Sequence, residues 1–548
     1  MLDLFVVQNQ QESLHFDYHF NGKAIGEAGS HSEIDLLPSF PYYNKAPFIL
    51  RMFRYIITDE IFREGVRKYV SRQAFHSTTT SNNFWTAMED ALDENLEPEY
   101  IHEHNINLRD TMIAWMKQKH YPVVSLIRDY YFGWVSVWLE SYIQSELQEL
   151  RIPLTFTSQT YPNFNRTSLD NVKWLRYKRT DWPRLDGFSI NHKENGWIIA
   201  NLQQSGYYRV NYDSENWNRI TTYLNSEEYT NIHVLNRAQI IDDSFHLAIQ
   251  KQQNFSLFWN LTRYLSRETD YIAWYPMFKA LEYMSNIFPF QNRIVDDIKI
   301  SLHKILGNLL ATIGYHRQFN ENIFTKYLRQ EATKWACTLN HQRCLEEANN
   351  KLQQYFIHSE RNILFPWWKE WTYCEGLKLA DGYTWRRLLH KLLRKDSYIQ
   401  KTNKTLEMLA CPQDLNIIKE YLSLITSNMK NINILKMIED FENIHIFHSI
   451  VAKHSNDFDI LDLIFSNFYN IKPCKVSTIV ALIDIINHVY SEEQLKKVSQ
   501  FVIDKIKIEG SLSSYVEYKI NLRSSQIEKQ AIFLQLLKPA EDVTYIRH

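Results

Sequence analysis

Histidine pairs at helical spacing are the side chains of this sequence that could bind a metal ion. His15 and His19 lie four residues apart, and His445 and His448 lie three apart, so each pair could share one face of a helix. No third ligand is obvious beside the first pair, whereas a zinc site needs at least three protein ligands. In the string His102-Glu103-His104 the histidines are two residues apart and cannot share a helix face. We therefore expect packing or surface roles for these histidines.

Other catalytic motifs are missing from the 548 residues. The sequence contains no H-E-x-x-H, no G-x-S-x-G, no Walker A motif, and no G-x-G-x-x-G between a strand and a helix. The pair Asp242-Asp243 could perform acid–base chemistry, but we expect it to start a helix or to form hydrogen bonds between domains. For the aromatic segment 206–213 we expect a strand whose tyrosines pack and whose Arg209 pairs within a domain interface.

Residues 1–119 show mainly helical patterns. Acidic residues at the start and basic residues later favour a helix over 59–70. Its expected apolar face consists of Ile61, Phe62, Val66, Tyr69 and Val70. Ser81 precedes apolar residues at helical spacing and is the expected N-cap of the next helix.

Residues 120–213 read as a small β-sandwich. Residues 121–127 open as a strand, and residues 152–157 alternate with period two. Residues 197–202 and 206–212 are expected to form a hairpin around residues 203–205. Between these strands, residues 129–150 look more helical than extended.

Residues 214–548 predict helix after helix with short connections, which is typical of an α-solenoid or bowl. Glycine and proline are scarce, with 13 and 14 residues, which also favours helices. The predicted fold is therefore mainly α with a small β-sandwich. Its domains are a helical part (1–119), the sandwich (120–213) and the bowl (214–548).

Charge and apolar segments exclude several classes of protein. The formal net charge is -2, so nothing attracts a nucleic acid to the chain as a whole. No stretch reaches the roughly 18 consecutive apolar residues of a membrane span. The first residues have no basic region before an apolar run, and the last are too polar for a GPI-anchor signal.

Several segments resemble the aminopeptidase N family, in the family's order. Residues 43–52 (YNKAPFILRM) resemble Y-x-K-G-A-x-x-L-R-M, with Ala-Pro in place of Gly-Ala. Residues 118–123 (QKHYPV) resemble Q-x-G-Y-P-V, and residues 206–213 (GYYRVNYD) resemble a family strand. Residues 236–243 (NRAQIIDD) resemble N-R-A-Q-L-I-D-D, and residues 3–7 resemble the stretch after the family's third zinc ligand. The resemblance covers nearly the whole chain.

The resemblance implies a zinc hydrolase that removes N-terminal residues from peptides. It also implies that residues 1–119 are the C-terminal helical part of a thermolysin-like catalytic domain, which precedes the sandwich and the bowl. In that family H-E-x-x-H and a distant glutamate hold zinc, a G-x-M-E-N loop holds the substrate amine, and a tyrosine stabilises the oxyanion. Only the tyrosine has a counterpart, at Tyr43. A phenol is protonated at neutral pH and can donate a hydrogen bond to developing negative charge.

The five cysteines also fit the resemblance, which implies disulfides Cys337–Cys344 and Cys374–Cys411 and leaves Cys474 unpaired. Free buried cysteines are the alternative from the residues alone. The disulfides would indicate an oxidising compartment. Four N-x-[ST] sequons predict glycosylation sites in a secreted chain, at Asn165, Asn254, Asn260 and Asn403.

Two hypotheses follow for the function. In the first, about 450 upstream residues carry the signal peptide, the amine-binding loop and the zinc site of an active ectoenzyme, extracellular or at the plasma membrane. In the second, the chain is a non-catalytic binding or scaffold relative. Under both hypotheses we expect the 548 residues alone to bind no catalytic zinc. Peptides are the expected partners of the enzyme, a membrane would be contacted only through segments outside this chain, and a homodimer is left open.

Overall fold

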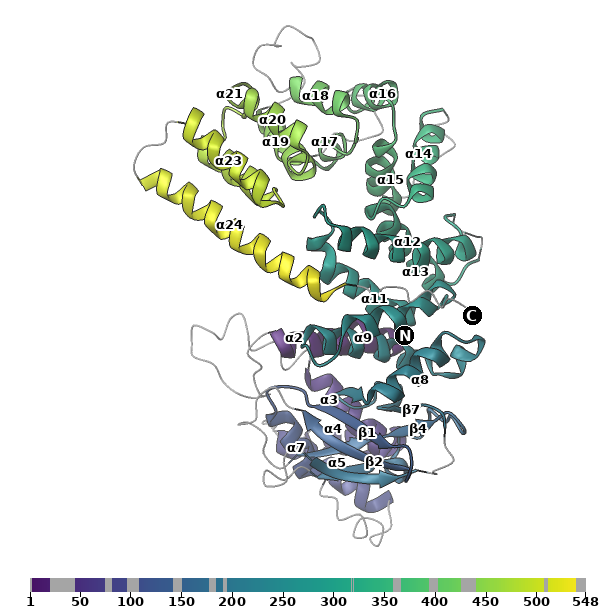
Figure 1. Cartoon of the computed structure of the whole chain (residues 1–548). Helices are drawn as coiled ribbons and strands as arrows, with labels where there is room; N and C mark the ends of the chain where they lie inside the picture. Colours follow the sequence, from purple (N-terminus) through teal and green to yellow (C-terminus); the bar gives the residue numbers. More distant parts are fainter. Residues whose placement is uncertain are drawn as a thin grey trace, which may run out of the picture. The chain divides into compact units, whose positions relative to one another are not determined.

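The computed structural model describes residues 2–19, 45–73, 81–95, 108–140, 150–176, 184–190, 195–316, 318, 320–357, 366–393, 403–424, 440–506 and 511–538. The protein is mainly helical with a small β portion, as the sequence predicts (Figure 1). The chain divides into two compact units, Met1–Ala280 and Leu281–His548. The three domain boundaries drawn from the sequence stay predictions.

The first unit begins with helices that are followed by strands. The helices are α1 (Leu2–Phe5), η1 (Val6–Gln10), α2 (Gln11–His19), α3 (Ala46–Ile57), α4 (Asp59–Gln73), α5 (Ser81–Asn95) and α7 (Leu108–Lys117). Pro47 stands in the first turn of α3, where a missing N–H costs no helical hydrogen bond. The helix predicted over 59–70 is α4, and α5 begins at Ser81.

One residue of the predicted apolar face of α4 is misplaced. Ile61 is buried, but Val70 is 60% exposed. Nine residues separate the two, which at 3.6 residues per turn places them on opposite sides of the helix.

The strands form one sheet of four and two of two. They are β1 (Val123–Asp129), β2 (Trp134–Glu140), β3 (Arg151–Leu154), β4 (Phe156–Ser158), β5 (Lys173–Arg176), β6 (Arg184–Ser189), β7 (Ile198–Ala200) and β8 (Arg209–Tyr212). The order in the large sheet is β6-β2-β1-β8. β1 pairs with β2 antiparallel and with β8 parallel, whereas β3 pairs with β5 and β4 with β7.

Two sequence-based expectations in this region are wrong. Residues 197–202 and 206–212 form no hairpin, because β7 pairs with β4 while β8 pairs with β1. Between them lies the short helix η5 (Leu202–Gln204), with left-handed backbone at Asn201, Gln203 and Gln204 that redirects the chain. Residues 134–140, expected to be helical, form β2, where Val135, Val137 and Leu139 are buried in alternation with more accessible residues.

Helices complete the first unit and bury its N-terminal segment. They are α8 (Ser214–Leu224), η6 (Glu227–Asn231), α9 (Val234–Ile249), α10 (Phe255–Thr262), η7 (Arg263–Ser266) and α11 (Tyr271–Met284), whose last turn lies in the second unit. Val6 and Val7 of η1 pack with Leu235 and Ala238 of α9 and with Ile272. The chain's first helices are therefore fixed against residues more than two hundred positions away.

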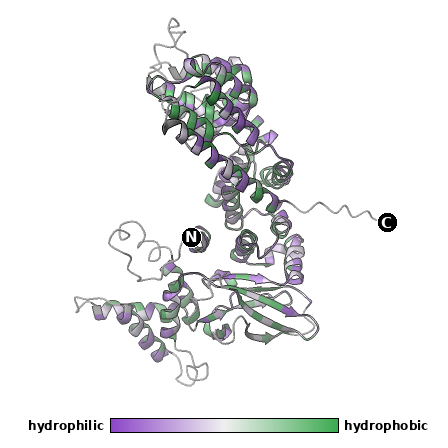
Figure 2. Ribbon diagram, turned by 60° about the vertical axis from the view of Figure 1, so that its left-hand side comes forward, coloured by the Kyte–Doolittle hydropathy of each residue, from purple (hydrophilic) through white to green (hydrophobic). Residues whose placement is uncertain are grey.

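The described residues of the second unit form helices and the turns between them. The helices are η8 (Ser285–Ile287), α12 (Arg293–Ile313), α13 (Ile323–Thr338), α14 (Gln342–Ile357), α15 (Pro366–Lys378), α16 (Gly382–Leu393), α17 (Asn403–Met408), α18 (Leu415–Ser423), α19 (Asp440–His454), α20 (Phe458–Ser466), α21 (Phe468–Ile471), α22 (Thr478–Asn487), α23 (Glu492–Lys505) and α24 (Ser511–Leu536). Their ribbons carry hydrophobic and hydrophilic stripes, as expected of helices that pack on one face (Figure 2). The 26-residue α24 packs against α12, α22 and α23.

Candidate functional site

Tyr43, the residue with an implied catalytic role, lies outside the described residues. The described chain resumes at Lys45, directly before α3, and this lysine is buried with 1% of its surface exposed. Its Nζ donates to Asp17 Oδ2 at 3.0 Å and to the carbonyl oxygens of Gln118 at 2.9 Å and Lys119 at 3.1 Å. Lys45 thus ties the start of α3 to α2 and to the chain before β1.

A buried tyrosine completes the surroundings of Asp17. The Tyr207 hydroxyl donates to Asp17 Oδ2 at 3.0 Å and lies 2.7 Å from Ser13 Oγ. Burial, with the charge of Asp17 in second place, raises the pKa of Tyr207 well above its usual value, so this hydroxyl stays protonated. Lys45 also lies 5.4 Å from the centre of the Tyr207 ring. The carboxylate therefore has a buried cation and a neutral donor beside it, an arrangement that positions chain segments.

A second contact links α3 to the strained turn before β8. Arg51 is buried, and its Nη1 donates to the Gln204 carbonyl at 2.5 Å and to Gln10 Oε1 at 3.2 Å. Its Nη2 donates to the Gln203 carbonyl at 2.9 Å. Burial lowers the pKa of Arg51, but an arginine remains charged at neutral pH. Its charge compensates carbonyl groups in a left-handed turn that is costly for residues other than glycine.

Two asparagines hold the same turn from its other side. The Asn201 side chain accepts from Gly206 N at 2.7 Å and donates to the carbonyl oxygens of Gly206 at 3.2 Å and Tyr208 at 3.0 Å. Asn236 of α9 donates to the Asn201 carbonyl at 3.1 Å and accepts from Gln203 N at 2.8 Å. The turn is therefore fixed by side chains from α3 and α9.

Arg209 of β8 forms the ion pair expected for it, with the acidic pair of α9. Its Nη1 lies 2.6 Å from Asp242 Oδ2 and 2.9 Å from Asp243 Oδ1, and all three side chains are buried. Asp243 also accepts from Val210 N at 3.1 Å and from Gln239 Nε2 at 3.1 Å. The expected helix-start role is wrong, because both aspartates lie in the middle of α9, whereas the expected pairing between segments is present.

The two carboxyl groups titrate in opposite directions. Burial disfavours the charged form of both, but the Arg209 charge lowers the pKa of Asp242 to about 2. Burial, aided by the neighbouring charge of Asp242, raises the pKa of Asp243 to about 7. Despite burial, the two carboxylates raise the pKa of the Arg209 guanidinium. One cation between two buried carboxyl groups thus favours a proton on one of them.

Among the described residues, His15 lies beside a histidine of α9 and not in a group of metal ligands. The ring centre of His15 lies 5.1 Å from that of His246, whose Nε2 is 3.4 Å from Asp242 Oδ1. The side chain of His19 and the string at 102–104 lie outside the described residues. In the second unit, His445 Nδ1 is 3.9 Å from a Glu407 oxygen.

His448 pairs with Asp484 rather than with His445. Its Nδ1 lies 3.0 Å from Asp484 Oδ1, and the ring of His488 is 5.6 Å away. Over the part of the chain that the structure describes, no three His, Cys, Asp or Glu residues are grouped so that they could hold a metal ion. The histidines whose side chains the structure describes therefore do not provide a set of zinc ligands.

Both disulfides implied by the family resemblance are present. Cys337 and Cys344 link α13 to α14, and Cys374 and Cys411 link α15 to the chain after α17. Cys474 is free and exposed.

The four sequon asparagines differ in their surroundings. Asn165 and Asn254 are exposed, Asn260 is half-buried, and the side chain of Asn403 is outside the described residues. Asn254 caps α10 by accepting from Ser256 N at 2.9 Å. Glycosylation of these residues stays a prediction.

Two known protein families match different parts of this chain. The ERAP1-like C-terminal domain family matches residues 197–517, which is more than half of the chain, and the peptidase family M1 domain matches residues 1–103. The chain belongs to the aminopeptidase N family. The hydrogen bonds of Arg51 to residues 203 and 204, and the bond between Tyr207 and Asp17 beside Lys45, thus join residues of the M1 match to the start of the C-terminal domain.

Curated relatives agree with this family. Aminopeptidase N of Plutella xylostella is 26% identical over 503 residues, which cover 88% of this chain and 50% of that protein. Human aminopeptidase N is 26% identical over 401 residues, 70% of this chain and 38% of the relative. The rat thyrotropin-releasing hormone-degrading ectoenzyme is 25% identical over 425 residues, 72% of this chain and 37% of the relative. The chain therefore spans half or less of the length of these relatives.

The M1 peptidase family is generally zinc-dependent, and a relative from Manduca sexta is named a membrane alanyl aminopeptidase. Within the described ranges, no helix of this chain is long and apolar enough to cross a membrane.

The residues that anchor α3 were not singled out from the sequence. Lys45 belongs to the Y-x-K segment, and Arg51 interrupts an apolar helical run between Leu50 and Met52. A charged residue on an otherwise apolar face is the signal that could have found Arg51, because such a residue is rarely buried without a partner. Its partner at residue 204 could not be read from local pattern.

Proposed function

We propose that this chain forms part of a zinc-dependent aminopeptidase that removes N-terminal residues from peptides. The observation that carries the proposal is that both family segments meet in one buried polar network. Lys45 fixes the start of α3 against Asp17 and Tyr207, and Arg51 fixes α3 against the turn before β8. A catalytic group at Tyr43, two residues before Lys45, needs a rigid support, and the fixed start of α3 would supply one.

In this proposal Tyr43 donates a hydrogen bond to the oxyanion that develops during attack on the peptide carbonyl. A protonated phenol supplies the donor without a proton transfer. Zinc, where it is bound, would polarise that carbonyl and activate water. The 548 residues contain no H-E-x-x-H, so we propose that zinc ligands must come from residues outside them and that this chain alone is inactive.

The disulfides support an oxidising compartment, and we propose an extracellular or plasma-membrane location with peptides as partners. Carbohydrate at Asn165 and Asn254 would be compatible with their exposed positions. Mass spectrometry of native glycopeptides would test both sites.

The first experiment is the intact mass and N-terminal sequence of the native, deglycosylated protein, together with its aminopeptidase activity. The proposal expects an active species clearly heavier than 65.7 kDa. An inactive native species of that mass, starting at Met1, would instead support a non-catalytic binding or scaffold protein.

The role of Tyr43 is tested in the active native form with Tyr43→Phe. Loss of one oxyanion donor should lower kcat by about 100- to 1,000-fold. KM should change little, because the hydrogen bond strengthens only in the transition state. A variant with unchanged kcat would remove Tyr43 from the proposal.

A further inference from the structure

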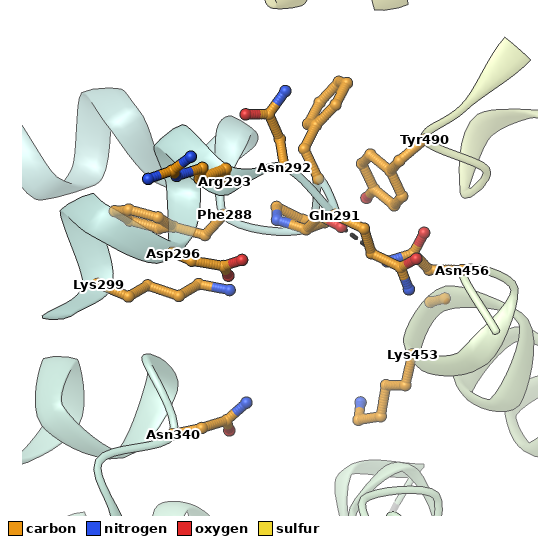
Figure 3. Close-up of a pocket in the computed structure, with 13 residues that line it drawn as sticks. Phe288, Gln291, Asn292, Arg293, Asp296, Lys299, Asn340, Lys453, Asn456 and Tyr490 are labelled. Atoms are coloured by element: carbon orange, nitrogen blue, oxygen red, sulfur yellow. Dashed lines mark hydrogen bonds between the residues drawn. The ribbon is translucent and has the colours of Figure 1, made fainter. Parts of the chain in front are cut away.

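A pocket of about 650 Å³ lies within the second unit (Figure 3). Its walls come from the loop before α12 and the first turns of that helix, from the residues after α13, from α19 and the loop after it, and from the residue preceding the N-cap of α23. This volume suits a small organic molecule. The pocket lies in none of the segments that carry the proposed peptidase chemistry.

The charged residues of the lining are mostly basic. Among the described residues that line the pocket, Lys299, Lys453 and Arg293 are basic and Asp296 is acidic. The ammonium groups of Lys299 and Lys453 point into the cavity from opposite walls, whereas the guanidinium of Arg293 lies at its edge (Figure 3). Neither lysine side chain forms an ion pair or hydrogen bond with any other residue that the structure describes. The pocket therefore holds two ammonium groups that face each other and that are neither hydrogen-bonded nor ion-paired within the described part of the chain.

Partial desolvation acts on both ammonium groups. Burial lowers the pKa of Lys299, which is half-buried, and the nearby charge of Asp296 opposes this change. Burial also lowers the pKa of Lys453. The negative charge of Glu407 opposes this change, and the positive charge of Lys378 adds to it. The Lys453 side chain is exposed, whereas Lys299 is more enclosed. The carboxylates near these lysines, Asp296 for Lys299 and Glu407 and Glu375 for Lys453, do not form ion pairs with them, so an anion in the pocket could contact both ammonium groups directly.

Amide groups give the pocket directed hydrogen-bond donors. Lys378 donates to Asn340 Oδ1 at 3.0 Å, which leaves the Asn340 NH₂ group directed at the cavity (Figure 3). On the opposite wall, Asn456 donates to the Pro289 carbonyl at 2.7 Å and its own carbonyl accepts from Gln494 at 2.6 Å. These contacts fix the walls relative to each other without using the two lysines.

We propose that this pocket binds a small organic anion that carries two acidic groups, carboxylate or phosphate, between Lys299 and Lys453. The amide of Asn340 donates to one of its oxygens. The apolar part of the ligand packs against Phe290 and Tyr490, whose ring centres lie 5.8 Å apart. This site is independent of the proposed peptidase function, and binding is measurable on the chain as it exists.

The test is isothermal titration of the full 548-residue chain with succinate and with inorganic pyrophosphate, and with neutral succinamide as the ligand control. We expect saturable binding at one site per chain by at least one of the two anions and none by succinamide. Binding by succinate alone identifies a carboxylate ligand, and binding by pyrophosphate alone identifies a phosphate ligand. If neither anion binds saturably at millimolar concentration, the proposal is wrong.

Variants locate the site. Lys299→Gln and Lys453→Gln should each weaken binding by about tenfold, because each removes one charge-assisted hydrogen bond. Lys304→Gln is the matched control, since Lys304 lies on the same helix, is exposed and does not line the pocket. Asp296→Asn should tighten binding by removing a repulsive charge. Equal weakening by the control, or weaker binding by Asp296→Asn, would show nonspecific attraction and overturn the assignment.

Discussion

Replacing Lys45 by methionine should destabilise the first unit strongly. The substitution keeps the chain length and apolar stem but removes the ammonium group, which donates to Asp17 and to two backbone carbonyls. Asp17 is buried, with 3% of its side chain exposed, and would keep the Tyr207 hydroxyl as a donor but lose its cation. Breaking a buried ion pair from one side costs about 3–5 kcal/mol.

Lys68→Met is the matched control, in the same unit. Lys68 pairs with Glu94 at 2.6 Å, but Glu94 is 62% exposed, so this surface pair should contribute less than about 1 kcal/mol. The double variant Asp17→Asn/Lys45→Met should lose less free energy of unfolding than Lys45→Met alone, since it leaves no uncompensated carboxylate in the core.

The assay must read the first unit alone, because a chain with two units need not unfold in one step. Urea titration with hydrogen-exchange mass spectrometry, followed on peptides covering residues 46–57 and 207–212, provides this. If Lys45→Met and Lys68→Met lower the free energy of unfolding of the first unit equally, the buried ion pair does not fix α3.

Two further predictions concern pH and disulfides. The raised pKa of Asp243, about 7, means that the folded state holds a proton more tightly than the unfolded chain between about pH 4 and pH 7, so its contribution to stability falls as pH rises through that window. The stability difference between the native chain and Asp243→Asn, measured by urea unfolding, should shrink from about pH 5 to about pH 7.5, and a growing difference would contradict the assignment. Replacing Cys374 and Cys411 by serine should cost about 4 kcal/mol, against about 2 kcal/mol for Cys337 and Cys344, because the separations are 37 and 7 residues. The same order is expected in thermal unfolding of the two double variants, and the reverse order would point to native-state contacts instead of loop entropy.

Local pattern predicted much of the helical structure. The periodicity over 59–70 and after residue 214 reports burial on one face, which is a property of neighbouring residues, and both regions are helical. Residue 70 was misplaced because apolar character alone does not distinguish the two sides of a short helix.

Strand pairing could not be predicted in the same way. Residues 197–212 have the composition of a hairpin, but the left-handed conformations at Asn201, Gln203 and Gln204 depend on Arg51 and Asn236, which are distant in sequence. Such tertiary contacts override local propensity. An ion pair for Arg209 could be predicted, because buried charges need partners. The position of its acidic partners in the middle of α9 could not.

Our proposal that the zinc ligands come from residues outside the 548 residues of this aminopeptidase N-family chain is tested most directly by metal analysis and a peptidase assay on the isolated chain. We expect less than stoichiometric zinc and no release of N-terminal amino acids from peptides. One tightly held zinc ion per chain, removed together with peptidase activity by a chelator, would contradict the proposal.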